Sequence, residues 1–158
     1  MASYALANST VATAEPPHLV TATSTYTDTF VREATYYFTI AVPASAGKPL
    51  QQVNFTQKQG LEQIQFDGKD SRAFEGTPNR KGQKLAFQLT RSDKQKDTVT
   101  VIFDQPIQPG QTVTIGLKPY RNPSYEGVYL FQLTGFFSRQ QGDSQYLGTG
   151  RLQFYRSE

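Results

Sequence analysis

The chain has 158 residues with no cysteine and no tryptophan, and its 16 basic and 13 acidic residues give a formal net charge of +3. This length allows one domain with a full hydrophobic core, and the lack of cysteine excludes disulfides, thiolate metal sites and cysteine catalysis. Aromatic residues make up 13% of the chain, which favours a β-rich globular domain over a disordered one.

The amino-terminal segment, residues 1–17, contains no Lys or Arg and ends at Pro16-Pro17. Its composition predicts a flexible arm. Ala5-Leu6-Ala7 has the small-x-small form found before signal cleavage sites, so we expect the arm to be the remnant around a removed signal peptide. Residues 18–158 are expected to form a single domain. No apolar run approaches the ~18 residues that a membrane span requires.

Apolar and polar residues alternate from Leu19 onward, which is typical of half-buried strands in antiparallel sheets. The residues expected on the buried faces are Tyr36, Phe38, Ile40 and Val42; Val53 and Phe55; Ile64 and Phe66; Leu85, Phe87 and Leu89; Val99, Val101 and Phe103; Val113, Ile115 and Leu117; and Leu152 and Phe154. Eight or nine short strands of this kind predict an all-β, antiparallel, immunoglobulin-like β-sandwich, with a small β-barrel as the alternative.

Turn-forming residues separate these segments. The expected turns and loops are 43–49, 67–68, 78–82, 106–110, 122–123 and 142–143. Pro109-Gly110 suits a type II turn, because proline presets the first central φ and glycine accepts a positive φ at the second.

The segment GVYLFQLTGF, residues 127–136, is apolar on both faces, which predicts a strand that is central in its sheet or covered on both sides. Pro119, Asn122 and Pro123 restrict the connection that precedes it. We expect Arg121 to fix this connection by binding loop carbonyls or a carboxylate such as Glu126 or Asp104.

The same connection is also the best candidate for a ligand site. Tyr120 and Tyr125 flank Arg121 and Asn122 and are the tyrosines most expected to be exposed. In a ligand-binding loop at 119–126, Tyr120, Arg121, Asn122 and Tyr125 would be the anchors, with Arg121 facing an anionic group. We favour the role of Arg121 in fixing the connection over a role in binding a ligand.

Basic residues concentrate in the middle of the chain. Eight of the 16 lie between positions 69 and 96: Lys69, Arg72, Arg80, Lys81, Lys84, Arg91, Lys94 and Lys96. Four acidic residues are interspersed among them, so solvated loops and strand faces are favoured over a patch for an anionic surface or polymer. Few aromatic residues accompany the cluster, which argues against nucleic-acid binding.

The residue types that catalysis requires are scarce. His18 is the only histidine, and no Gly-x-Ser-x-Gly elbow or phosphate-binding loop occurs. Glycoside hydrolysis needs a pair of carboxylates, and candidates such as Glu62 and Asp67 lie among residues typical of turns and surfaces. We therefore expect no enzyme, no metal site and no cofactor.

Several blocks resemble a known family in order and spacing: TYYFTIAVPASAGKPLQQVNF, AFEGT, FDQPIQPGQTVTIGLKPYRNPSYEGVYLFQLTGF and LGTGRLQFY. They are similar to DUF2808, a cyanobacterial family of secreted proteins of unknown function, over roughly residues 19–155. The resemblance implies an extracytoplasmic location, in the periplasm or at the cell surface, and implies no reaction.

These observations favour a non-enzymatic β-sandwich that acts as an interaction or cell-envelope module, with an envelope protein or glycan as partner. The alternative is a carrier of a small ligand, glycan or ion that uses the 119–126 loop.

Overall fold

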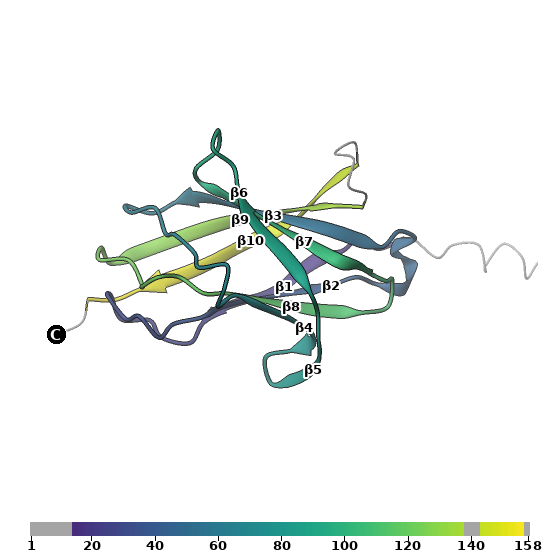
Figure 1. The fold of residues 1–158 in the computed structure, drawn as a ribbon, viewed down its shortest axis with the longest axis horizontal. Coiled ribbons are helices and arrows are strands. Elements are labelled where there is room, and N and C mark those ends of the chain that lie inside the picture. Colours follow the sequence, from purple (N-terminus) through teal and green to yellow (C-terminus); the bar gives the residue numbers. More distant parts are fainter. Residues whose placement is uncertain (1–13, 138–142, 157–158) are drawn as a thin grey trace, which may run out of the picture.

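The computed structural model of this protein describes residues 14–137 and 143–156, which form two five-stranded sheets packed face to face (Figure 1). In sheet order, the first contains β1 (His18–Ser24), β2 (Tyr36–Ala41), β8 (Thr112–Leu117), β4 (Arg72–Thr77) and β5 (Arg80–Lys84). The second contains β10 (Ser144–Phe154), β9 (Gly127–Phe136), β3 (Leu50–Gln59), β7 (Thr98–Ile107) and β6 (Phe87–Arg91). All the strand pairs within these sheets are antiparallel.

The core lies between the sheets and includes most of the residues predicted to be buried; Leu85, Phe87 and Leu89 are only partly buried against it. Phe38 of β2 contacts Phe55 of β3 and Phe131 of β9, with ring centroids 5.0 and 6.0 Å apart. All three are buried, and edge-to-face contacts of this kind stabilise a core beyond the area they bury. The antiparallel sandwich, immunoglobulin-like in its face-to-face sheets, is confirmed. The barrel alternative is wrong because the two sheets do not join into one closed sheet.

The strand predicted around Ile64 and Phe66 is not one. Both side chains are buried, but the segment between β3 and β4 is irregular and contributes only an isolated bridge from Phe66 to Pro119. The Ile64 amide donates to the side-chain Oε1 of Gln57 in β3 at 2.9 Å, and not to a backbone carbonyl as in a strand ladder. The segment places apolar side chains into one end of the core. The alternation of apolar and polar residues alone does not distinguish such an irregular buried segment from a strand.

The prediction of a loop at 78–82 is also wrong for residues 80–82, which belong to β5. β4 and β5 form a hairpin in which Thr77 pairs with Arg80, so that only Pro78 and Asn79 lie in the turn. Every residue of β5 is exposed, and a strand without a buried face has no apolar alternation. Leu85, predicted within a strand, connects β5 to β6, because β6 begins at Phe87.

Two predicted turns have the expected geometry. Gly110 has a φ of 96°, and the Gln111 amide donates to the Gln108 carbonyl at 3.1 Å, as a type II turn requires. At Asp67, a side-chain oxygen accepts from the Lys69 amide at 2.9 Å, a local bond that favours a turn.

β9 is an interior strand, as its sequence predicts, with β10 and β3 as neighbours. Tyr129, Phe131 and Leu133 are buried between the sheets, whereas Val128 and Leu130 on the other face are only half-buried. The apolar side chains on the outer face of β9 are therefore only partly covered.

Helical structure in the described residues is limited to the short 3-10 helix η1 (Ala44–Ala46). No helix in that part of the chain is long and apolar enough to cross a membrane. Residues 14–17 have no regular structure and β1 begins at His18; the rest of the predicted arm lies outside the described residues.

Edge strands β1 and β10, from different sheets, approach each other closely at one side of the sandwich. A Cβ atom on Gly150 would lie 2.8 Å from the Ala22 Cβ and 2.9 Å from Cε2 of Phe38. Only glycine allows the two sheets to meet at this distance without displacing the core.

We expect Gly150→Val to lower the free energy of unfolding by about 1–3 kcal/mol, because the added side chain overpacks the contact between β1 and β10. Arg151→Val, one residue along the same strand, is the control, since Arg151 is exposed. Urea unfolding of both variants gives the comparison. Equal stability of the two variants would show that the close approach does not exist.

Candidate functional site

Three connecting segments and the residues that follow β10 meet at one end of the sandwich, which we call the loop end: residues 25–35, 60–71, 118–126 and 155–156 (left side of Figure 1). Backbone hydrogen bonds join them. The Asn122 amide donates to the Val31 carbonyl at 2.7 Å, the Tyr120 amide to the Gln65 carbonyl at 3.1 Å, and the Thr29 amide to the Tyr155 carbonyl at 2.9 Å. The loops therefore form one connected surface.

Asn122 lies beneath this surface and is completely buried. Its Oδ1 accepts from the Tyr36 hydroxyl at 2.7 Å, and its Nδ2 donates to the Tyr26 and Asp28 carbonyls at 3.0 and 2.8 Å. Both ends of the amide are engaged within the protein, so the structure places Asn122 among the residues that hold the loops together.

Two buried tyrosines from the core extend to the loop end. Besides the Tyr36 hydroxyl, which binds Asn122, the Tyr129 hydroxyl donates to the Tyr125 carbonyl at 2.8 Å. Burial is the main cause that raises the pKa of both phenols above the ordinary value. Both hydroxyls therefore remain neutral donors, and each fixes one end of the 122–125 segment to the core.

Arg121 fixes its loop as the sequence predicts, but through a different carboxylate. Nη1 donates to the Asn122 carbonyl at 2.9 Å, while Nη2 lies 3.1 Å from Oε2 of Glu62. Neither Glu126 nor Asp104, the predicted partners, contacts it; Glu126 instead pairs with Arg156. Glu62 is 59 positions away in the sequence, and only the fold brings the two together.

The Glu62 carboxylate joins the two halves of the loop end. Its Oε1 accepts from the Ser124 amide at 2.9 Å and from the Ser124 hydroxyl at 2.5 Å. Partial burial raises the pKa of Glu62, but the bonds from Ser124 and the charge of Arg121 outweigh it, and the net pKa is lowered. Glu62 is therefore ionised and fully engaged at neutral pH, which does not suit a general acid.

Phe30 is the one residue other than glycine with a positive φ among the described residues, at 68°. A bulky residue in this region is strained, and here the Phe30 amide donates to the Pro123 carbonyl at 3.2 Å. The ring is 59% exposed, with the Arg121 guanidinium 5.6 Å from its centroid. The backbone conformation thus keeps a large apolar ring exposed to solvent.

Other large apolar residues are exposed nearby. Of the eight such residues in the described part of the chain, six lie at the loop end: Tyr26, Phe30, Leu61, Tyr120, Tyr125 and Tyr155. Tyr120 and Tyr125 are each 57% exposed, in agreement with the sequence analysis, and the Arg91 guanidinium lies 5.9 Å from the Tyr120 ring. The exposed large apolar side chains of the described residues are therefore concentrated at the loop end.

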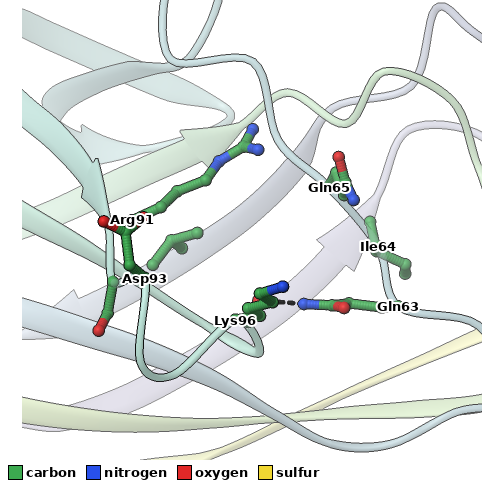
Figure 2. Close-up of a pocket in the computed structure, with 8 residues that line it drawn as sticks. Gln63, Ile64, Gln65, Arg91, Asp93 and Lys96 are labelled. Atoms are coloured by element: carbon green, nitrogen blue, oxygen red, sulfur yellow. Dashed lines mark hydrogen bonds between the residues drawn. The ribbon is translucent and has the colours of Figure 1, made fainter.

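Two small hollows lie at the loop end or beside it. One, of about 180 Å³, lies between residues 63–65 and the 91–96 segment, where the Gln63 side chain donates to the Lys96 carbonyl (Figure 2). A second, of about 310 Å³, lies between Glu62 and Gln65 on one side and Tyr120 and Arg121 on the other.

Of the four predicted site residues, the structure therefore exposes Tyr120 and Tyr125, half-exposes Arg121 and buries Asn122. Sequence reasoning missed Phe30 as a surface residue, and it treated Glu62 as an ordinary solvated carboxylate. No local signal identifies either role. Residues 14–137 and 143–156 contain no group of three or more His, Asp or Glu side chains that could hold a metal ion.

A family model described as a protein of unknown function (DUF2808) matches residues 10–154. No curated protein matches the sequence significantly. Among solved structures, the chain is similar to a collagen-binding domain from a Staphylococcus aureus adhesin, with 9% identity, a TM-score of 0.45, and coverage of 92% of this chain and 99% of that one. A likeness this distant supports no conclusion about what the present chain binds.

The Glu62 network generates a pH prediction. We expect Glu62→Gln to lower the free energy of unfolding at pH 7 by about 1–2 kcal/mol, because charge-assisted bonds to Ser124 and Arg121 are weakened. The folded pKa lies below the ordinary value of a Glu side chain. This stabilisation is therefore fully present above the ordinary, unfolded pKa and is lost as the pH falls through the folded pKa. Urea unfolding between about pH 7 and pH 3 should show the two proteins converging.

Glu126→Gln is the matched control. The Glu126 side chain is 55% exposed and pairs at 3.5 Å with Arg156, which is 77% exposed; such pairs add little to stability. A difference between wild type and Glu62→Gln that stays constant with pH would contradict the assigned role of the carboxylate.

Proposed function

We propose that this chain, which belongs to the DUF2808 family of proteins of unknown function, is a non-enzymatic binding module that engages a macromolecular partner through its loop end. The observation that carries the proposal is the set of exposed apolar side chains held on internally bonded loops. Six of the eight exposed large apolar residues that the structure describes lie there.

The rigidity of the loops supports this role. Tyrosine provides a large, amphipathic contact area and loses little conformational freedom on binding. The Tyr36 and Tyr129 hydroxyls, the Asn122 amide and the Glu62 carboxylate already fix the loop that includes Tyr120 and Tyr125. Ordering before binding lowers the entropy lost on association, so the surface is suited to a protein or glycan of the cell envelope.

The chemistry of the same surface favours binding over catalysis. Glu62 is the only carboxylate among the residues of the hollow beside Tyr120 and Arg121, and its oxygens accept from Ser124 and Arg121. An acid–base pair needs a second group with a different pKa within reach. His18, with its Nδ1 near the Pro16 carbonyl, is the first residue of β1 and belongs to none of the loop-end segments.

A carrier role for the 119–126 loop, the second possibility, is less favoured. Arg121 would be its cationic anchor, but its guanidinium already pairs with Glu62 and lies over the Phe30 ring. An anion would have to displace the carboxylate. The location outside the cytoplasm, which the sequence resemblance implies, is part of our proposal and agrees with an envelope partner.

The proposal predicts that partner contact is confined to the loop end. A photo-crosslinking amino acid at position 125 should capture a partner in cells of the native host. The same residue in place of Tyr146, which is 56% exposed against 57% for Tyr125, should capture none, because Tyr146 lies near the start of β10, away from the loop end. Gel mobility of the tagged protein, before and after glycosidase or protease treatment, separates a glycan from a protein.

Equal capture from positions 125 and 146 would indicate non-specific contact and contradict the proposal. Capture from position 146 alone would assign the interface to the other end of the sandwich.

A further inference from the structure

A groove of about 410 Å³ lies beside β4 and β5 on the first sheet. Its apolar wall includes Tyr37, Phe74, Leu85 and Phe87. Arg72, Lys81 and Lys84 provide its charged groups. Of the loop-end segments, only the buried Ser71 lines it. None of the exposed aromatic side chains of the loop end does, so the groove is distinct from the proposed interface.

The register of the sheet builds one wall of the groove. Tyr37 of β2 and Arg72 of β4 both pair with Gly116 of β8, so the three residues form a row across the outer face. A Cβ atom on Gly116 would lie 3.0 Å from Cε1 of Tyr37. The glycine therefore leaves the space that the Tyr37 ring occupies beside Arg72.

Phe74 lies in the adjacent row, opposite Thr114. It is 5% exposed, although it is not part of the main core between the sheets. The Tyr37 ring lies 6.1 Å from it, and the Lys81 ammonium is 5.4 Å from the Phe74 ring and 5.6 Å from the Tyr37 ring. The β4–β5 hairpin thus forms a small apolar site outside the core with a cation at its edge.

The cations of the groove lack anionic partners within the part of the chain that the structure describes. The three ion pairs found there involve Lys48, Arg121 and Arg156. No Asp or Glu is among the described residues that line the groove. Three positive charges beside apolar side chains, without a carboxylate, are complementary to a ligand with an anionic group and an apolar body.

Basic residues on β5 have a second explanation, because charged side chains protect an edge strand from pairing with another chain. This explains an exposed run such as Arg80 and Lys84. It does not require a buried Phe74 outside the core, or a Gly116 that makes room for the Tyr37 ring. The groove has features beyond those that edge protection needs.

We propose that this groove binds a small amphiphilic anion, in which a carboxylate, sulfate or phosphate contacts Arg72, Lys81 and Lys84 and an apolar chain or ring contacts Tyr37, Leu85 and Phe87. Its volume falls within the range of about 300–1,000 Å³ that is typical of small-ligand sites. The basic cluster recognised in the sequence thereby acquires a specific role at three of its eight positions.

Decanoate, at concentrations where it is monomeric, is the probe. Calorimetric titration should show saturable binding, with decanol and acetate each at least about tenfold weaker, because the site needs both the charge and the chain. In nuclear magnetic resonance spectra, decanoate should shift the amides of Tyr37, Phe74 and Leu85. Amides of the loop end, such as that of Tyr125, should not move.

The double variant Arg72→Gln/Lys84→Gln should weaken decanoate binding by about tenfold or more. Both side chains are exposed, so its unfolding midpoint should match that of wild type. Lys69→Gln/Lys94→Gln removes the same charge from exposed positions outside the groove and should change binding less than about twofold.

Three results would overturn the proposal: equal losses in the two double variants, equal affinity for decanol, or no saturable binding of decanoate. Binding to vesicles of anionic lipid without binding to monomeric decanoate would also overturn it, since that result indicates a charged surface instead of a built groove. None of these outcomes depends on whether the loop end binds a partner.

Discussion

The loop end depends on the hydrogen bonds of one buried group, the side-chain amide of Asn122. Its oxygen binds the Tyr36 hydroxyl and its nitrogen binds the Tyr26 and Asp28 carbonyls. It thereby connects the turn before β9 both to the core and to the loop between β1 and β2. Without it, the buried Tyr36 hydroxyl would lose its partner, and an unsatisfied buried group costs about 1–3 kcal/mol. The single amide therefore couples the packing of the sandwich to the shape of its surface.

That coupling explains how the loops hold side chains that are unfavourable on their own. Phe30 keeps a positive φ and an exposed ring because the Pro123 carbonyl binds its amide and the Arg121 guanidinium lies over the ring. Arg121 in turn is held by Glu62. Strain of this kind persists only where the surrounding structure determines the conformation, and at a surface it is an indication of function.

The sequence predicts the sandwich well because alternation reports burial, as at Tyr36, Phe38 and Ile40. The prediction fails where a residue is buried but does not belong to a strand, or belongs to a strand but is not buried. Ile64 and Phe66 are buried without a strand, and β5 is a strand without a buried face. The exposure of Tyr120 and Tyr125 followed from their position around a turn. The Glu62 partner of Arg121 could not be predicted, because local spacing contains no information about a contact 59 positions away.

Native-state hydrogen exchange tests the preorganised loop end most directly. In the structure, the Phe30 amide donates to Pro123 and the Asn122 amide to Val31, at 3.2 and 2.7 Å. If the loops are held as described, both amides should exchange about as slowly as that of Phe38 in β2 and far more slowly than that of Asn79 in the β4–β5 turn. Exchange of Phe30 and Asn122 as fast as that of Asn79 would contradict a rigid loop end and, with it, the binding surface.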